Sequence, residues 1–399
     1  MIAELDFQCS RLEIVLCVVF LAVLSLLLQC LYLLHMAQVC LEAASAAAAA
    51  AAFSVVSMTA LRTPRLVRIG TDFSGLDTAL IALRRLPHIP LQLAFCSDSD
   101  QHCKKLLLNF HEPVKFYDDA SSRKQQDELP VDVYIATPPC QPWSSQGKRK
   151  GLKDPRGQLL KVPLVYISRH RPRLCMVENV KGLCAKKNRG VLKGIKQTLQ
   201  KLKYRVFMGV LNASDFQVPQ NRQRLFIIAI RQDSYRRTFR WPKKKGKRSL
   251  SSVLDPPRLT DQPGRLPQKK RGRDLAKEAY KKVFSTGVDP RKTPVAIDVG
   301  CSKAFASYGV DISRTLCYGR AKTGGFWLSN KGRKMTTEEM MKVSGLNPDE
   351  ELLGWEKFVS KASFQGMLGN CVPVPLVGSV LQNAMHAAGL ISHTVEFPA

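Results

Sequence analysis

The chain has no two cysteines separated by two residues, although its 399 residues include 12 cysteines. Zinc ribbons and dense disulfide frameworks both depend on regularly spaced cysteines, so neither is encoded here, and we expect no metal site. Cysteines scattered in this way fit a reducing compartment best.

Acidic residues are also scarce. The sequence has 32 Asp and Glu against 61 Lys and Arg, which gives a formal net charge of +29. Such a charge attracts a polyanion whatever the fold, so nucleic acid is the leading partner, although a basic plastid or ribosomal protein has a similar balance. The length allows one large core with a smaller second domain, because single cores stop growing near ~250–300 residues.

The residues before the long apolar run lack the net positive charge that a cleavable secretory signal has at its beginning. Residues 14–34 are almost wholly apolar and long enough to cross a ~30 Å bilayer as a helix. Acidic residues outnumber arginine before this run, whereas Arg62, Arg65 and Arg68 follow it and favour a cytosolic location for the rest of the chain. We interpret residues 1–60, which include a run of alanines, as a transmembrane anchor, with a targeting leader or a removed extension as the alternatives.

From Leu66 onward, short apolar runs alternate with loops and helical stretches, which is typical of an α/β fold with a doubly wound parallel sheet. Helices are predicted over 76–86 and 190–202. Ligands bind at the carboxyl ends of the strands in such sheets, so the candidate site lies there. The predicted strands cover residues 66–71, 91–97, 131–138, 173–180, 204–211 and 224–231.

A basic segment rich in Pro and Gly interrupts this pattern after residue 231. It carries 18 Lys and Arg against 5 Asp and Glu over 231–282, a net charge of +13. This composition is typical of a solvated linker or an import signal. The alternative is an edge of a DNA-reading domain that contacts phosphates.

The residues that indicate chemistry are concentrated in ATPPCQPWSSQG, residues 136–147. Cys140 lies at the mouth of a predicted strand, on a loop that three prolines stiffen. An isolated cysteine is more often a small buried apolar residue than a nucleophile. Glu178 supplies a candidate acid, however, and the cations of QNRQR (220–224) supply a positive field that favours a thiolate.

Several motifs, in the same order along the chain, resemble those of the cytosine-5 DNA methyltransferase family over residues 66–390. They are FSGLDT (73–78), PPCQPWS (138–144), GLKDPRGQL (151–159), MVENV (176–180), QNRQR (220–224), RKMTTEEMMKVSGL (333–346) and GNCVPVPLVGSVL (369–381). The resemblance implies a Rossmann-like methyltransferase sheet with a small target-recognition domain, preceded here by the hydrophobic helix.

The resemblance also implies catalytic roles. Cys140 would attack C6 of a cytosine flipped out of double-stranded DNA, and Glu178 would hold or protonate its N3 edge. Arg224 would reach the cytosine O2, and Arg222 would brace the nucleophile loop.

S-Adenosylmethionine is the methyl donor that the resemblance implies. Asp98 would bond the ribose hydroxyls, and Asp118 or Asp119 would meet the adenine amino group. FSGLDT departs from the family's glycine-rich turn at Asp77 and Thr78; Asp77 would either accept the cofactor's ammonium group or repel its carboxylate. The cofactor-binding residues expected are Phe73, Gly75, Leu76, Asp98, Asp119, Pro139, Leu159, Asn370 and Val372.

The predicted domains are the N-terminal segment (1–60), a catalytic domain (61–232), a basic linker with the target-recognition region (233–312), and a C-terminal region (313–399) whose last helix returns to the catalytic domain. We expect a monomer in the nucleus or a DNA-containing organelle. One alternative is a tRNA cytosine-5 methyltransferase, although the Cys-Phe-Thr tripeptide of that group is missing. The other is a catalytically silent DNA-binding relative.

Overall fold

The chain divides into two compact units, Met1–Arg65 and Leu66–Ala399. The computed structural model describes residues 11–56, 65–87, 89–144, 149–302, 304 and 306–398. The first unit contains helix α1 (Arg11–Val56), in which Val18–Ser45 has a mean hydropathy of 2.3 and is exposed throughout. The predicted N-terminal hydrophobic helix is therefore confirmed, and it extends well beyond residues 14–34.

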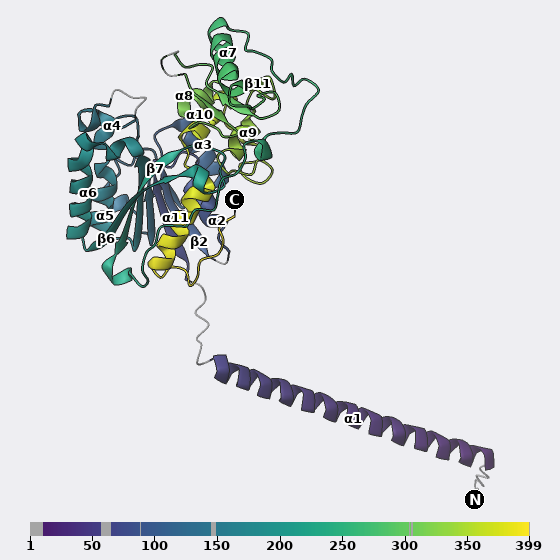
Figure 1. Ribbon diagram of the computed structural model, residues 1–399. Coiled ribbons are helices and arrows are strands. Elements are labelled where there is room, and N and C mark those ends of the chain that lie inside the picture. Colours follow the sequence, from purple (N-terminus) through teal and green to yellow (C-terminus); the bar gives the residue numbers. More distant parts are fainter. Residues whose placement is uncertain are drawn as a thin grey trace, which may run out of the picture. The chain divides into compact units, whose positions relative to one another are not determined.

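The second unit is built around a seven-stranded sheet with the order β3-β2-β1-β4-β5-β7-β6 (Figure 1). All neighbouring strands are parallel except β7, which is antiparallel to both β5 and β6. The connection from β6 to β7, residues 213–222, is too short for a crossover helix, so the chain must return antiparallel. The strands are β1 (Val67–Asp72), β2 (Leu91–Ser97), β3 (Lys115–Tyr117), β4 (Val133–Ala136), β5 (Leu174–Val180), β6 (Tyr204–Asn212) and β7 (Gln223–Arg231).

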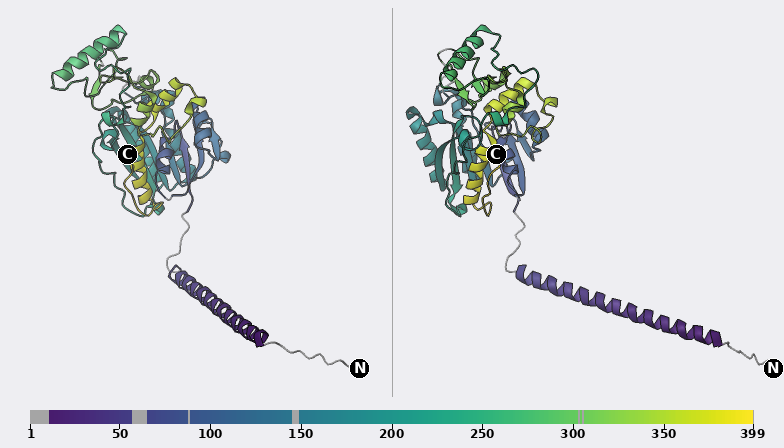
Figure 2. Two further views of the ribbon diagram at one scale, coloured as in Figure 1. Left: turned by 90° about the vertical axis from the view of Figure 1, so that its right-hand side faces the viewer. Right: turned by 45° about the vertical axis from the view of Figure 1, so that its right-hand side comes forward.

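Helices cover both faces of this sheet (Figures 1 and 2). Successive residues of a strand point to opposite faces, so Ile135 and Met176 join the core beneath α2 and α11, whereas Tyr134 and Cys175 join the core beneath α5 and α6. Strands buried on both sides explain the continuous apolar runs in the sequence. The helices around the sheet are α2 (Thr78–Arg84), α3 (Gln101–Phe110), α4 (Pro155–Gln158), α5 (Lys161–His170), α6 (Arg189–Lys201), α10 (Lys361–Asn370) and α11 (Val374–Ala387).

A small domain follows the large sheet in the sequence. Its antiparallel sheet has the order β11-β10-β8-β9, and apolar residues of α7 (Lys270–Phe284) pack on it, including Ala276 and Val283. A capping box of Thr336 and Glu339 starts α9 (Thr337–Lys342). The remaining elements are β8 (Val295–Ile297), β9 (Tyr308–Val310), α8 (Tyr318–Lys322), β10 (Trp327–Leu328) and β11 (Arg333–Lys334).

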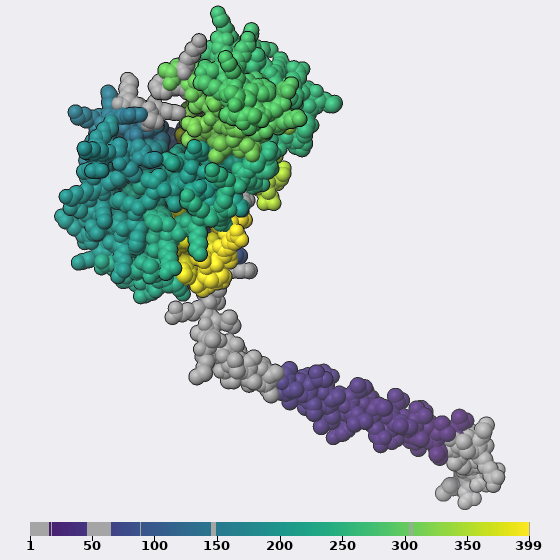
Figure 3. Space-filling view, in the orientation of Figure 1, coloured from purple at the N-terminus to yellow at the C-terminus, as the bar shows by residue number. Residues whose placement is uncertain are grey.

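Two segments outside residues 61–232 pack against the large sheet and its helices. The beginning of the basic segment packs on β6, where the Phe239 and Phe207 rings are 4.9 Å apart and Trp241 covers Gly209. The C-terminal helix α11 packs on α2, β5 and β7, and Figure 3 shows this end of the chain against segments from the middle of the sequence.

Candidate active site

A cleft of 1090 Å³ opens at the carboxyl ends of β1, β2, β4 and β5. Strand β1 has β2 on one side and β4 on the other, so the order of the strands reverses at β1. The cleft therefore lies at the topological switch point, where such sheets bind ligands. It is lined by all four predicted catalytic residues and by seven of the nine predicted cofactor residues: Cys140, Glu178, Arg222, Arg224, Phe73, Gly75, Leu76, Asp98, Pro139, Asn370 and Val372.

Cys140 lies on the loop that leaves β4, and backbone contacts hold it in place. Asn179 donates a hydrogen bond from Nδ2 to the Pro138 carbonyl (3.1 Å), and the Cys140 carbonyl accepts from the Trp143 and Ser144 amides (3.0 and 2.9 Å). Burial raises the pKa of the Cys140 thiol, while Arg224 and Arg222 lower it. Burial has the larger effect on this pKa. The two arginines, which were expected to favour a thiolate, therefore do not bring the Cys140 pKa below its ordinary value.

Glu178 and Arg224 form a buried ion pair beside this loop. The Arg224 Nε is 2.9 Å from the Glu178 Oε1, and both side chains are about nine-tenths buried. Glu178 lies opposite Phe226 in the antiparallel pairing of β5 and β7, and Arg224 is two residues from Phe226 on the same face. Burial raises the pKa of the Glu178 carboxyl, and Arg224 and Arg222 oppose this shift.

Arg222 is fully buried and connects the start of β7 to the C-terminal region. Its guanidinium donates hydrogen bonds to the carbonyls of Leu316 (2.6 Å), Gly369 (3.1 Å) and Asn370 (3.0 Å). Burial lowers the Arg222 pKa to about 10. These hydrogen bonds join Arg222 to the segment that brings Asn370 to the cleft, and its expected role in bracing the nucleophile loop stays a prediction.

The turn after β1 forms the other side of the cleft. Phe73, Gly75 and Asp77 all have left-handed backbone conformations, with φ of 58°, 58° and 49°. The Gly75 amide donates to Asp98 Oδ2 (2.8 Å), and the Ser74 amide donates to the Ser97 carbonyl (2.9 Å). Non-glycine residues adopt this conformation only where other contacts hold them, so the turn is a strained and well-fixed element of the site.

The Asp77 side chain is turned into the protein. Its Oδ1 accepts the Leu80 amide (3.1 Å), which caps α2, and its Oδ2 accepts the Thr71 hydroxyl (2.7 Å). Burial raises the pKa of this carboxyl, and His111 lowers it. Asp tolerates the left-handed conformation better than most residues and is a strong N-cap, which explains how it replaces a glycine here.

The other predicted cofactor residues divide into two groups. Asp98 is half-buried at the cleft, and burial raises its pKa; its carboxylate accepts the Gly75 and Asp100 amides and retains lone pairs for a ligand. Asp119 and Leu159 are not among the described residues that line the cleft. Asp119 accepts hydrogen bonds from the backbone and hydroxyl of Ser121 (both 2.8 Å), so its proposed contact with adenine stays a prediction.

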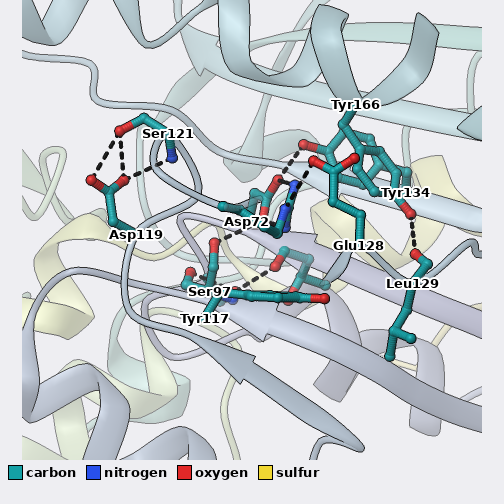
Figure 4. A network of polar contacts seen from close by, with 12 residues as sticks. Asp72, Ser97, Tyr117, Asp119, Ser121, Glu128, Leu129, Tyr134 and Tyr166 are labelled. Carbon is teal, nitrogen blue, oxygen red and sulfur yellow. Dashed lines mark hydrogen bonds and ion pairs between the residues drawn. The ribbon is translucent and has the colours of Figure 1, made fainter. Parts of the chain in front are cut away.

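A buried charged network lies beneath the cofactor side of the cleft, and sequence reasoning missed it. The Arg123 guanidinium donates two hydrogen bonds to the Asp72 carboxylate (2.9 and 3.0 Å). Asp72 also accepts from Ser97 Oγ (2.7 Å) and from the Tyr134 hydroxyl, as Figure 4 shows. The Phe95, Tyr117 and Tyr166 rings surround the guanidinium at 4.8–5.1 Å. Asp72 ends β1 and lines the cleft, so this network fixes the end of the strand from which the turn starts.

The sheet order and the cleft at its switch point define a Rossmann-like methyltransferase fold, and the solved structures agree. Entamoeba histolytica methyltransferase EhMeth is 19% identical, with a TM-score of 0.56 and coverage of 80% of this chain and 98% of that one. The S. pombe Dnmt2 methyltransferase is 16% identical, with a TM-score of 0.55 and coverage of 81% and 99%.

A family model described as C-5 cytosine-specific DNA methylase matches residues 73–386. The chain therefore belongs to the C-5 cytosine-specific DNA methylase family. It is 39% identical over 130 residues to the type II methyltransferase M.HgiBI of Herpetosiphon aurantiacus, a match that spans 32% of this chain and only 30% of that relative. It is 26% identical over 261 residues to M.HhaI of Haemophilus parahaemolyticus, which covers 63% of this chain and 75% of the relative.

Proposed function

We propose that the chain is a DNA (cytosine-5-)-methyltransferase that transfers a methyl group from S-adenosylmethionine to C5 of a flipped cytosine through a covalent adduct on Cys140. The observation that carries this proposal is the buried Glu178–Arg224 pair in the same cleft as Cys140. A thiol, a carboxyl of raised pKa and a guanidinium match the groups that addition to cytosine requires.

The residues of the cofactor side fit S-adenosylmethionine. The half-buried Asp98 offers carboxylate oxygens suited to ribose hydroxyls, and Phe73 and Val372 offer apolar surface for the adenine ring. The bound cofactor would supply an electrophilic methyl group. Asn370 and the strained turn of Phe73–Asp77 would hold it from opposite ends of the chain.

Cytosine C5 is a poor nucleophile until a group adds across the 5,6 bond. Cys140 would give up its proton to water and bond to C6 as the thiolate while Glu178 delivers a proton to N3, which places electron density on C5. After C5 has gained the methyl group, loss of the C5 proton to water or another base and return of the N3 proton to Glu178 would restore the 5,6 double bond and expel the thiolate. Arg224 would orient the base through its O2, and the cytosine must leave the stacked duplex to reach these groups.

The test combines two substrates with one variant. Bisulfite sequencing of duplex DNA incubated with the protein and S-adenosylmethionine should show new 5-methylcytosine, and Cys140→Ser should abolish it with DNA affinity retained. DNA containing 5-fluorocytosine cannot lose the C5 substituent as a proton and should accumulate an adduct on Cys140. An adduct on another cysteine, or methylation of tRNA in place of DNA, would overturn the proposal.

We also infer that α1 anchors the enzyme to a membrane within a DNA-containing compartment. Its segment Val18–Ser45 is long enough to span a bilayer, and its apolar side chains, such as Phe20, Leu27 and Leu34, are all exposed. Exposed apolar surface of this extent is unfavourable in water, which supports a lipid environment.

A further inference from the structure

A surface rich in positive charge lies outside the small domain. Residues 179–214 contain nine Lys and Arg and no Asp or Glu. All nine cationic side chains are exposed, and none forms an ion pair with a residue that the structure describes. We call this surface the basic face; its members are Lys181, Lys186, Lys187, Arg189, Lys193, Lys196, Lys201, Lys203 and Arg205.

The basic face is centred on α6, which covers the face of the large sheet opposite α2 and α11 (Figure 1). Ile195 and Leu199 are buried and point from α6 toward the sheet. Arg189, Lys193 and Lys196 are spaced by four and three residues, so they form one row along the helix surface. The row therefore presents several charges side by side to the solvent.

Two glycines of α6 lie among these cations and have no role in packing. A Cβ at Gly190 or at Gly194 would meet nothing within 4 Å. Glycine inside a helix is less stable than alanine, and neither position needs a positive φ or a close contact within the protein. Glycines four residues apart beside Arg189 and Lys193 leave two neighbouring positions of the helix surface without a side chain.

The basic face begins at the rim of the cleft. Lys181 lines the cleft itself, followed by Gly182 and Cys184 of the 3₁₀ helix η3 (Lys181–Cys184). From there the positive surface continues through η4 (Lys186–Asn188) to α6 without an acidic residue. The segment that leaves the cleft on this side therefore carries only positive charges.

We propose that the basic face binds the phosphate backbone of double-stranded DNA beyond the segment that carries the target cytosine. The inference rests on the proposed function in naming DNA as the polyanion. Lys and Arg that neutralise phosphates release counterions, so each contact steepens the salt dependence of binding. The face would hold the enzyme on long DNA without affecting the chemistry in the cleft.

Charge reversal tests the proposal in the full chain kept in non-ionic detergent. Lys193→Glu with Lys196→Glu should weaken binding to a 40-base-pair duplex about tenfold or more and reduce the salt slope, because each lost phosphate contact removes about 0.9 from it. Binding and methylation of a 12-base-pair duplex centred on the target should stay unchanged. The control, Lys357→Glu with Lys361→Glu, changes the same charge at two exposed residues, one at the end of the 3₁₀ helix η9 (Trp355–Lys357) and one at the start of α10, and should leave binding to both duplexes unaffected.

The glycines supply a second, independent measurement. Gly190→Ala with Gly194→Ala should raise the urea midpoint of unfolding and yet weaken binding to the 40-base-pair duplex, since the added methyl groups keep a backbone at a distance. A solvated face with no partner would show only the gain in stability, which would contradict the proposal.

Three further outcomes are distinguishable. Equal affinity of the charge-reversed and control variants for the long duplex would overturn the proposal. So would a loss of binding to phosphatidylserine vesicles with DNA binding unchanged, because the face would then serve a membrane surface. If the unsubstituted chain methylates neither duplex but the charge reversal still weakens binding to the long one, the proposed function fails and the basic face stands.

Discussion

Thr137 donates a hydrogen bond from Oγ1 to the carbonyl of Phe73 (2.7 Å). This contact joins the loop that carries Cys140 to the turn that forms the cofactor side of the cleft. The Thr137 amide also donates to the Asp72 carbonyl (3.1 Å), so the two loops are connected twice. The loop that carries Cys140 and the turn of Phe73–Asp77 are therefore held against each other through Thr137.

The raised pKa of Cys140 leads to a prediction for its reactivity. Because burial favours the neutral thiol, the free protein should react slowly with iodoacetamide at neutral pH, and the rate should increase with an inflection above the ordinary thiol value of about 8.5. Arg224→Gln removes a charge that lowers this pKa, so labelling at a given pH should decrease. Mass spectrometry of the Cys140 peptide measures both effects, with the buried Cys103 as an unlabelled control. An inflection below pH 8 would contradict the prediction.

Arg123→Met should destabilise the protein strongly. The variant leaves the Asp72 carboxylate buried without its counter-charge, and breaking such a pair costs about 3–5 kcal/mol. Arg85→Met, which breaks the more exposed pair with Glu351, is the matched control and should cost clearly less. Urea unfolding measures both. Adding Asp72→Asn to Arg123→Met should recover part of the loss, and strict additivity of the two changes would show that the residues do not act as a pair.

Asp77 offers a test that separates capping from cofactor binding. Asp77→Asn keeps a capping side chain that tolerates positive φ, so its stability should stay close to that of the original chain, whereas Asp77→Ala should lose about 1–2 kcal/mol. Since the carboxylate is engaged by Leu80 and Thr71, Asp77→Asn should change the Kd for S-adenosylmethionine less than threefold by calorimetry. A tenfold weaker Kd would instead indicate that the carboxylate binds the cofactor's ammonium group.

Removal of the N-terminal unit should change partitioning and leave folding intact. A fragment of residues 61–399 contains the whole second unit, so it should be soluble and bind S-adenosylmethionine, while the full chain partitions into detergent. Leu24→Arg with Leu28→Arg in the full chain is the control; each arginine at the centre of a span costs about 2.5–3.5 kcal/mol, so partitioning should fall without loss of cofactor binding. An aggregating fragment beside a full chain that is soluble without detergent would refute this division.

The sequence predicted those parts of the fold and site that depend on local pattern. Continuous apolar runs located six of the seven strands of the large sheet, but β3 has only three residues and shows no pattern of its own. Cys140 and Glu178 were recognisable because each lies in a short motif at the end of a buried strand. The prediction of a parallel sheet was wrong for β7, which is antiparallel to both of its neighbours, because an apolar run does not show the direction of its strand.

Contacts between distant residues could not be predicted in the same way. Arg123 lies in a polar loop 51 residues from Asp72, and nothing in either neighbourhood indicates that the two meet. The partners of Arg222 lie 94 to 148 residues further along the chain, and the side chain is buried only because those segments fold back onto it. Such pairings depend on tertiary structure rather than on local pattern.

The return of the C-terminal region to the large sheet determines when the enzyme can first act. Phe73 and Asn370 face the same cleft, yet about 300 residues separate them, which corresponds to roughly 15–60 s of translation at ~5–20 residues/s. The apolar helix α1 leaves the ribosome well before the C-terminal residues that line the cleft, such as Asn370, have been synthesised. If α1 anchors the chain and the cleft binds cofactor and DNA as proposed, the order of synthesis brings the anchor to a membrane before methylation can begin.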